Sequence, residues 1–236
     1  MKIYAISDLH LSFIADKPMD LFGGHWTNYE ERILSDWNSK VGADDVGIIA
    51  GDISWAMRME ETAKDFEFLK KLNGHKIIIR GNHDYWWKSI SRIRSELGAD
   101  FSVLQNDSVK IGNTIFAGTR GWRVPERRQG QNDEDKKIYA REVQRLELAL
   151  KDVEKKRQEG DKLIAVIHYP PFNSTRDNSQ FTELMEQYKV DVCVYGHLHG
   201  KPGRAELITQ KNGIKYYLTS CDILDFKVTE INLDKA

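Results

Sequence analysis

Five short apolar segments, each followed at once by polar or glycine-containing residues, constrain the fold of this chain more than any other feature. The segments span residues 2–6, 46–50, 76–79, 163–167 and 190–195. They are rich in β-branched residues and nearly continuous in hydrophobicity, which is typical of strands that are buried on both faces. The sequence therefore predicts an α/β fold with these five strands in its interior.

Residues that can bind metal ions follow every one of these predicted strands. They are Asp8, His10, Asp52, Asn82, His168, His197 and His199. Open α/β sheets place their binding sites at the carboxyl ends of the strands, where loops from several strands converge. We therefore expect the seven side chains to meet at one edge of the fold.

The chemical types of these seven side chains indicate which ions they would bind. Oxygen and imidazole donors without a thiolate suit Mn, Fe, Zn, Co or Ni better than calcium or a structural zinc. Seven ligands are too many for one ion, because a closed zinc site needs four. Two ions that share one carboxylate are the simplest solution, and Asp52, which has no metal-binding neighbour in the sequence, is the natural bridge.

Charge counting predicts what such a centre would attract. Two divalent ions, offset by Asp8, Asp52 and a bridging hydroxide, leave a net charge of about plus one, which favours phosphate. Asn82 fits this count because its carbonyl oxygen binds a metal ion without cancelling charge.

The polar clusters resemble the motif series of the calcineurin-like metallophosphoesterase superfamily, which is D-x-H, G-D, G-N-H-[DE], a lone His and G-H-x-H. Here they are Asp8-Leu9-His10, Gly51-Asp52, Gly81-Asn82-His83-Asp84, His168 and Gly196-His197-Leu198-His199. All five occur in order. The resemblance implies an α/β fold, a four-layer α/β/β/α sandwich with two mixed β-sheets flanked by helices, and we expect one domain over residues 1–236.

The same resemblance implies roles for individual residues. One ion would be held by Asp8, His10, Asp52 and His199, and the other by Asp52, Asn82, His168 and His197. The implied activity is hydrolysis of a phosphate mono- or diester, through in-line attack by a metal-bound hydroxide. His83 would contact the substrate and stabilise or protonate the leaving oxygen, with Asp84 as its orienting partner.

Several alternatives are weighed against this hypothesis. His168 alone is typical of a histidine at a strand end, and Gly51-Asp52 alone of a turn; their joint order favours a two-metal site. A non-catalytic scaffold would be expected to lose ligands or His83. A nucleotide pyrophosphatase or cyclic-nucleotide phosphodiesterase would place Trp86 or Trp122 against a base. Residues 51–57 lack the Asp-Arg pair of the phosphoprotein phosphatases, which disfavours a protein substrate.

The substrate is expected to be a small phosphorylated molecule bound by loops at the mouth of the site. Residues 13–29, 54–58 and 118–137 are the candidate loops, and the last contains Arg120 and Arg123 beside Trp122. Arginine can hold a phosphate through two parallel hydrogen bonds. The alternative is a solvated loop of mixed charge.

Local patterns predict the remaining elements. Helices are expected at 63–72, 90–97 and 137–158, and hairpins joining 109–111 to 114–117 and 207–209 to 214–218. Both hairpins turn at a pair made of one glycine and one asparagine, and Asn-Gly is the favoured two-residue turn. We expect both hairpins in the second half of the sandwich.

Composition limits the remaining possibilities. With 40% hydrophobic and 30% charged residues, the chain is ordinary for a globular protein, and its net charge of −1 gives no support to a nucleic-acid binder. Only Cys193 and Cys221 are present, which favours a reduced, cytoplasmic setting. No segment approaches the roughly 20 apolar residues of a membrane helix, and a strand from Lys2 leaves no room for a signal peptide. The sequence leaves the oligomeric state and the native metal open.

Overall fold

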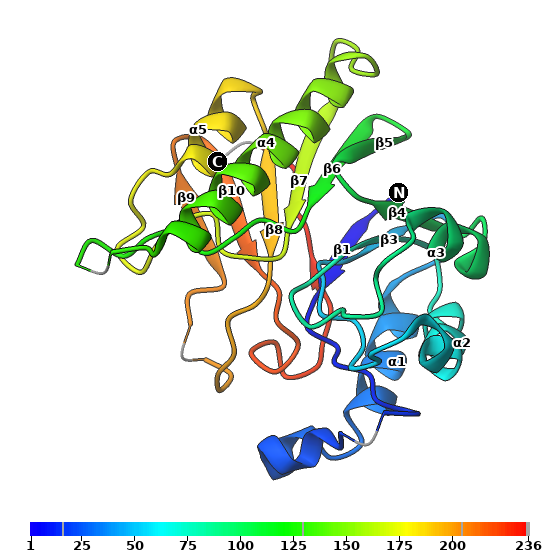
Figure 1. The fold of residues 1–236 in the computed structure, drawn as a ribbon. Coiled ribbons are helices and arrows are strands. Elements are labelled where there is room, and N and C mark those ends of the chain that lie inside the picture. Colours follow the sequence, from blue (N-terminus) through cyan, green and yellow to red (C-terminus); the bar gives the residue numbers. More distant parts are fainter. Residues whose placement is uncertain (16, 129, 204, 235–236) are drawn as a thin grey trace.

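The computed structural model describes residues 1–15, 17–128, 130–203 and 205–234. Its centre is formed by two β-sheets packed face to face, with helices on both outer faces (Figure 1). The strand order of the first sheet is β11-β1-β2-β3-β4. These strands are β1 (Ile3–Ile6), β2 (Val46–Ile49), β3 (His75–Ile79), β4 (Phe101–Leu104) and β11 (Thr229–Glu230). Strands β1 to β4 are parallel, and β11 is antiparallel to β1.

The second sheet has the strand order β5-β6-β7-β8-β10-β9. Its strands are β5 (Asp107–Ile111), β6 (Thr114–Thr119), β7 (Lys162–Ile167), β8 (Val192–Tyr195), β9 (Ile208–Lys211) and β10 (Ile214–Leu218). Strands β6, β7, β8 and β10 are parallel, whereas β5 and β9 are antiparallel edge strands. Both predicted hairpins are therefore confirmed, and both lie in the second sheet.

The helices cover the two outer faces of the sheets. They are α1 (Tyr29–Lys40), α2 (Ala63–Lys70), α3 (Ile90–Leu97), α4 (Asp133–Glu154) and α5 (Gln180–Gln187), with 3-10 turns η1 (Met19–Phe22), η2 (Gly24–Trp26) and η3 (Met59–Thr62). Helices α1 to α3 pack on the first sheet and α4 and α5 on the second, and a third apolar cluster fills the space between the sheets. This arrangement confirms the four-layer α/β/β/α sandwich.

Alternation along the strands explains why their sequences are apolar throughout. In β1, Ile3 and Ala5 face the second sheet, whereas Tyr4 and Ile6 face the helices. Strands with a packed layer on each side need apolar residues at every position.

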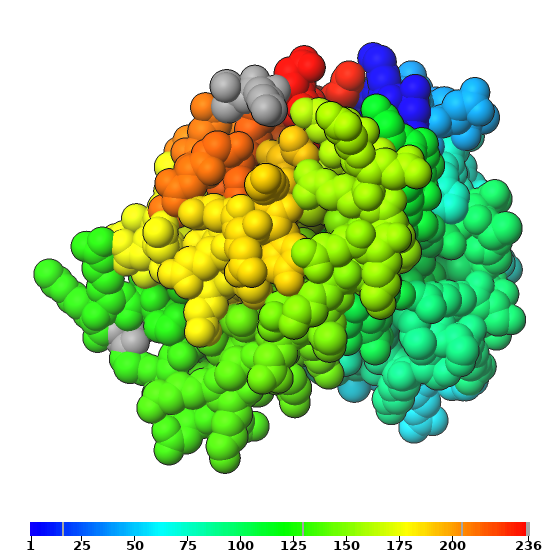
Figure 2. All heavy atoms as spheres, turned by 90° about the horizontal axis from the view of Figure 1, so that it is seen from above, coloured from blue at the N-terminus to red at the C-terminus, as the bar shows by residue number. Residues whose placement is uncertain are grey.

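The two sheets are joined directly at the carboxyl end of β1. The main-chain nitrogen of Ser7 donates to the carbonyl of Thr219, which follows β10, and the nitrogen of Cys221 donates back to the carbonyl of Ser7. Loops from both sheets therefore meet at this edge. The amino-terminal residues and the carboxyl-terminal segment that contains β11 lie side by side on the molecular surface (Figure 2), because β11 pairs with β1.

The segment 118–137, which we expected to be a loop, is only partly one. Its first two residues belong to β6 and its last five to α4. Helix α4 begins four residues before the predicted Lys137, because the Asn132 side chain caps it by accepting a hydrogen bond from the nitrogen of Asp135. Among the helices of the described residues, none has the length and apolar composition that crossing a membrane requires.

Candidate metal centre

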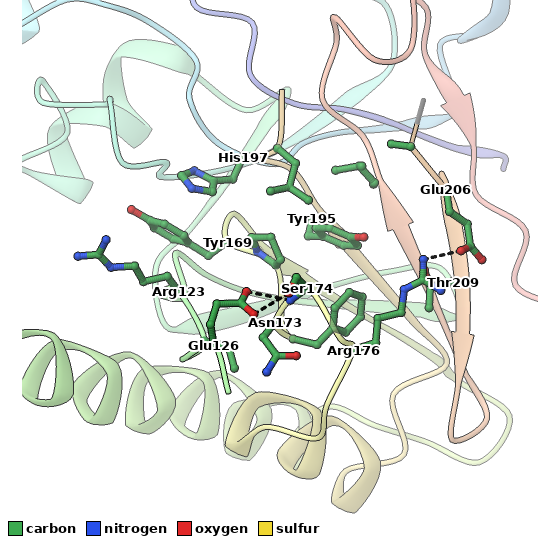
Figure 3. Close-up of a pocket in the computed structure, with 16 residues that line it drawn as sticks. Arg123, Glu126, Tyr169, Asn173, Ser174, Arg176, Tyr195, His197, Glu206 and Thr209 are labelled. Carbon is green, nitrogen blue, oxygen red and sulfur yellow. Dashed lines mark hydrogen bonds and ion pairs between the residues drawn. The ribbon is translucent and has the colours of Figure 1, made fainter. Parts of the chain in front are cut away.

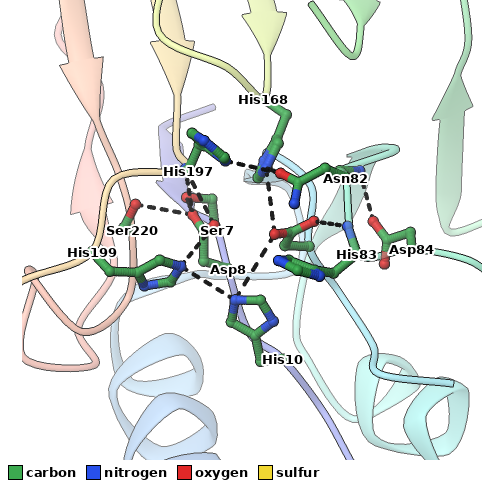
Figure 4. A network of polar contacts seen from close by, with 12 residues as sticks. Ser7, Asp8, His10, Asn82, His83, Asp84, His168, His197, His199 and Ser220 are labelled. Atoms are coloured by element: carbon green, nitrogen blue, oxygen red, sulfur yellow. Dashed lines mark hydrogen bonds and ion pairs between the residues drawn. The ribbon is translucent and has the colours of Figure 1, made fainter. Parts of the chain in front are cut away.

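The seven residues predicted to bind metal ions lie in five loops at the carboxyl ends of strands from both sheets. Asp8 and His10 follow β1, and Asp52 follows β2. Asn82 follows β3, His168 follows β7, and His197 and His199 follow β8. Figure 4 shows side chains from these loops pointing toward one another. The fold thus brings together residues that are far apart in the sequence, from Asp8 to His199.

The first group of donor atoms comes from Asp8, His10 and His199. The Nε2 atoms of His10 and His199 are 3.3 Å apart, and the latter lies 3.6 Å from Oδ1 of Asp8. All three residues offer a ligand atom within 4.8 Å of the other two. Two imidazole nitrogens that face each other beside a carboxylate are an arrangement that a cation stabilises.

The second group comes from Asn82, His168 and His197. Oδ1 of Asn82 lies 2.8 Å from Nε2 of His168 and 2.8 Å from Nδ1 of His197. These atoms are imidazole nitrogens and an amide oxygen, which also suit a divalent transition metal.

The Asp52 carboxylate lies between the two groups. Its Oδ2 atom is 3.4 Å from Nε2 of His168 and 3.9 Å from Nε2 of His10. Its Oδ1 atom accepts a hydrogen bond of 2.7 Å from the main-chain nitrogen of His83. Asp52 is therefore the residue whose position allows it to serve both groups.

Four of these seven residues have an uncommon backbone conformation. The φ angles are 58° at Asp8, 48° at His10, 50° at Asp52 and 71° at His197, all in the left-handed region. Each costs about 1 kcal/mol or more and persists only when the surrounding structure enforces it. Such strain is concentrated at functional sites, and here it accompanies the convergence of the side chains.

Two glycines allow the loops to approach each other closely. A Cβ atom at Gly81 would lie 2.1 Å from the nitrogen of Asp52, and one at Gly196 would lie 2.2 Å from Oγ of Ser7. Neither loop could hold its present position with a side chain there. Close packing of the loops thus explains why two of the three motif positions, 81 and 196, are glycine.

Hydrogen bonds to the far nitrogens orient two of the histidines. Nδ1 of His168 lies 3.0 Å from the carbonyl oxygen of Ala50, and Nδ1 of His199 lies 3.2 Å from Oδ2 of Asp222. A hydrogen on each Nδ1 leaves the Nε2 lone pair free for a metal ion, as is usual for histidine ligands. The residues present therefore fit a site for divalent cations.

Asp222 and Ser220 were missed in the sequence. Ser220 donates a hydrogen bond of 3.0 Å to Oδ2 of Asp8, and Asp222 is the partner of His199. Both follow β10 as the other clusters follow their strands. Residues 214–218 are a predicted strand, so the polar residues that follow it could have been recognised as candidates in the same way.

The electrostatics of the centre favour positive charge beside Asp52. Burial lowers the pKa of His168, but the Asp52 carboxylate, together with Asp8 and the Ala50 carbonyl, outweighs burial and raises it to about 9. Burial opposes ionisation of Asp52, yet the charge and hydrogen bond of His168 hold its pKa well below the usual range. Burial lowers the pKa of His10 to about 3 and that of His197 to about 4, so both rings are neutral, the form that binds metal.

Asp84 has partners other than the one predicted for it. Its fully buried carboxylate accepts hydrogen bonds from the nitrogens of Ile53 (2.9 Å) and Gly81 (2.7 Å) and from the indole of Trp86 (3.1 Å). Among the contacts of the described residues, none joins this carboxylate to the His83 ring. Asp84 ties the loop after β2 to the loop after β3.

The His83 ring is positioned by aromatic neighbours instead. Its centroid lies 4.5 Å from that of Trp55 and 5.6 Å from that of His10. Trp55 is nearly buried and stacks on His10 with centroids 4.8 Å apart. One tryptophan thus supports both a candidate ligand and the candidate substrate contact.

The predicted substrate contacts have different environments. Arg120 pairs with the buried Glu142 at 3.0 Å, and Trp122 packs on Tyr169 with centroids 5.2 Å apart. Arg123 pairs with Asp135 at 2.9 Å and lines a cavity beside His197. Trp86 is buried in the first apolar cluster, so it cannot stack on a base, which corrects this part of the expectation for a nucleotide-cleaving enzyme.

Two cavities adjoin the centre, and they contact different residues of it. The Arg123 pocket, of about 410 Å³, is lined by Arg123, Tyr169, His197 and neighbouring residues, and an ion pair of Arg176 with Glu206 lies at its other end (Figure 3). The second cavity, of about 550 Å³, is lined by Met19, Phe22, Trp26 and Trp55 together with His10, His83 and His199. We call it the aromatic pocket.

Comparison with known proteins gives a family match over most of the chain. Residues 1–201 match the model of the calcineurin-like phosphoesterases. An uncharacterised protein of Methanocaldococcus jannaschii is 30% identical over 108 residues. These are 44% of this chain and 58% of the relative, so the match spans less than two thirds of the relative's length.

Solved structures share the fold over almost the full length. A protein of unknown function from Aquifex aeolicus has a TM-score of 0.51 and 16% identity, with 97% of this chain and 95% of that one covered. The phosphopantetheinyl hydrolase of Mycobacterium tuberculosis has a TM-score of 0.59 and 15% identity, covering 99% and 96%. The protein TT1561 of Thermus thermophilus has a TM-score of 0.60 and 12% identity, covering 98% of both chains. At these identities the likeness shows the fold alone.

Proposed function

Because this chain belongs to the calcineurin-like phosphoesterase family, we propose that it is a two-metal hydrolase that cleaves a small phosphate mono- or diester. The observation that carries the proposal is the placement of Asp52 between two groups of metal-binding side chains, with its Oδ2 atom 3.4 Å from His168 and 3.9 Å from His10. A carboxylate in this position can serve two ions at once.

We assign the ligands by these groups. Asp8, His10, Asp52 and His199 would hold one ion, and Asp52, Asn82, His168 and His197 the other. Nitrogen and oxygen donors without a thiolate favour Mn, Fe, Zn, Co or Ni. When bound, such ions would neutralise the phosphoryl oxygens and lower the pKa of the attacking water.

The protein's own contribution is to place the leaving group and supply its proton. The His83 ring lies beside His10, and Trp55 fixes its orientation from the side. The main-chain nitrogen of His83 donates a hydrogen bond to Asp52, which anchors the backbone at this residue beside the centre. His83 would donate a hydrogen bond or proton to the leaving oxygen. Asp84 would act indirectly, by holding the two loops together.

The complete set of ligand positions, with His83 present, favours an enzyme over a scaffold that has kept only the fold. A nucleotide pyrophosphatase or cyclic-nucleotide phosphodiesterase is the second candidate. The aromatic pocket favours this candidate, because Trp26 and Phe22 line it beside the centre and could contact a base. These two residues would take the place of the expected Trp86.

Metal analysis combined with hydrolysis assays tests the proposal. Protein purified without added metal is analysed for bound metals and then assayed with Mn on phosphate mono- and diesters. We expect about two ions per chain and chelator-sensitive hydrolysis, and His83→Ala should slow turnover while retaining the metal. A metal-free, inactive protein that captures a tight binding partner would instead favour the scaffold.

A further inference from the structure

We infer that the aromatic pocket binds the leaving group of the substrate, and that this leaving group is an apolar or aromatic alcohol. The inference rests on the proposed hydrolysis of a phosphate ester and narrows its substrate class. It comes from the walls of the pocket, its connection to His83, and its contrast with the Arg123 pocket.

The walls of the aromatic pocket consist of large apolar side chains. Met19, Phe22, Trp26 and Trp55 line it from the loop after β1 and the loop after β2. Its volume of about 550 Å³ falls in the range of about 300–1,000 Å³ for small-molecule sites. Apolar and aromatic walls favour an occupant that loses little hydration on entering.

Most of these walls are held in place by their own contacts. The Trp26 ring meets those of Tyr29 and Phe226 edge to face, with centroids 5.1 and 5.0 Å apart. The indole nitrogen of Trp55 lies 3.1 Å from the sulfur of Met19. The pocket is therefore preformed, and little ordering of its walls opposes binding.

Phe22 is the exception, because its side chain is 59% exposed although it lines the pocket. An apolar occupant would cover part of this ring and remove apolar surface from water on both molecules. The neighbouring Leu21 is 79% exposed and does not line the pocket, which makes it a matched control.

His83 lines the aromatic pocket, and this position assigns the leaving group to that pocket. His83 lines the aromatic pocket together with His10 and His199, whereas the Arg123 pocket adjoins the centre through His197. In an in-line displacement, the leaving group departs on the side opposite the attacking water. The residue that contacts the leaving oxygen therefore marks where the departing alcohol lies.

Charge distinguishes the two cavities as well. The Arg123 pocket also has apolar walls, such as Phe172 and Leu218, but it carries Arg123, Glu126 and the ion pair of Arg176 with Glu206, so it can accommodate a polar arm. The aromatic pocket is lined by one lysine, Lys201, and one carboxylate, Asp222, which pairs with His199. A neutral, apolar group is the better occupant there.

The reaction needs no further reactant than water. The bond between phosphorus and the leaving oxygen breaks, the oxygen of water joins phosphorus, and one of its protons ends on the alcohol. His83 can give the leaving oxygen its proton and recover one from the water.

Two monoesters with leaving alcohols of similar acidity test the inference. We compare kcat/KM of the Mn-loaded protein for benzyl phosphate and ethyl phosphate, and the binding of the non-hydrolysable benzylphosphonate and ethylphosphonate by tryptophan fluorescence. We expect benzyl phosphate to be preferred by about tenfold or more. Phe22→Ala should remove most of this preference by slowing only the benzyl ester, and Leu21→Ala should retain it.

The outcomes separate the inference from the proposed function. Hydrolysis of both esters at similar rates, or equal effects of Phe22→Ala and Leu21→Ala, would overturn the inference and leave the hydrolase standing. Benzylphosphonate binding no tighter than ethylphosphonate would overturn it as well. The proposed function is overturned if the metal-loaded protein hydrolyses neither these two esters nor the phosphate mono- and diesters of the assay above. If only diesters are hydrolysed, the proposed function stands and the two phosphonates decide the inference.

Discussion

The two sides of the candidate centre are supported in different ways. His168 is fully buried directly after β7, and its Nδ1 atom bonds to the main-chain carbonyl of Ala50. The His199 side chain is 41% exposed and depends on a carboxylate, that of Asp222. Its neighbour His10 stacks on Trp55. One side of the centre is thus fixed by the backbone of the sheets, and the other by side chains from loops.

This difference shows which side can be altered by a single substitution. A main-chain carbonyl cannot be removed by mutation, whereas Asp222 can. The side supported by loops also borders the aromatic pocket, so the same loops that support His10 and His199 shape the space for a substrate. Substitutions on one side should therefore reduce the occupancy of one ion, and substitutions that act on both sides should reduce the occupancy of both.

Asp52→Asn should have the largest effect, because it acts on both sides at once. Replacing the shared carboxylate with a neutral amide removes the charge that both ions would use. We expect turnover to fall by roughly a thousandfold or more, together with a loss of bound metal measured by elemental analysis. Asp44→Asn, at an exposed turn, is the control. Normal metal-supported activity in the Asp52 variant would refute the bridging role.

Gly81→Ala and Gly196→Ala should also lower stability and metal binding strongly, but the two substitutions displace different ligands. The new methyl group would lie 2.1 Å from the nitrogen of Asp52 in the first case and 2.4 Å from Oδ2 of Asp8 in the second. Relieving such overlap typically costs about 1–3 kcal/mol or more, which thermal unfolding would record. We expect Gly81→Ala to reduce occupancy of both ions and Gly196→Ala mainly that of the ion near Asp8.

Gly130→Ala is the control for both glycines, since a Cβ atom there meets nothing within 4 Å. Equal metal content in all three variants would show that the close approaches do not shape the centre.

Asp222→Ala should weaken one side only. Without its carboxylate, the His199 ring loses the acceptor that orients it, which typically lowers metal affinity by about 10–100-fold. Competition with a chelator should then show one ion released early and the other unchanged. A parallel loss of both ions would mean that the two sides are not independently supported.

Arg123→Ala should have the smallest effect on activity. It removes one side chain from the lining of the Arg123 pocket, which lies beside His197. The side chain is exposed and already shared with Asp135, so we expect KM to rise by about threefold to tenfold with kcat unchanged. Arg127→Ala is the matched control, because Arg127 pairs with Asp177 outside the lining of that pocket. An identical KM in the two variants would remove Arg123 from substrate binding.

Predictions from the sequence succeeded where local pattern and packing agree. The strand that precedes Asp8 was predicted because both faces of it are packed, so every position is apolar. The hairpin at Asn212-Gly213 was predicted because Asn-Gly is the favoured two-residue turn, and the structure agrees, with positive φ angles of 51° and 80° at these residues. The start of α4 was missed because the apolar stripe begins after the cap, at Tyr139, whereas the helix begins beyond Asn132.

Prediction failed where a side chain's partner is distant in the sequence. Asp84 adjoins His83 in the chain, yet its carboxylate bonds to Ile53 and Ser54. Asp222 lies far from every recognised motif and still contacts His199. Neither partner follows from spacing, because loops from different strands bring them together.

The sequence by itself determined the buried strands and the positions at strand ends from which metal-binding side chains project, since these depend on hydrophobic pattern and residue type. The family, and with it the two mixed sheets, followed from the resemblance that the five motifs carry. The tertiary structure decided how those side chains are grouped, with Asp52 between the groups and four residues held at strained φ angles. It also placed Phe22, Trp26 and Trp55 around His83. Contacts between loops from two sheets depend on how the sheets pack, and no local pattern records that packing.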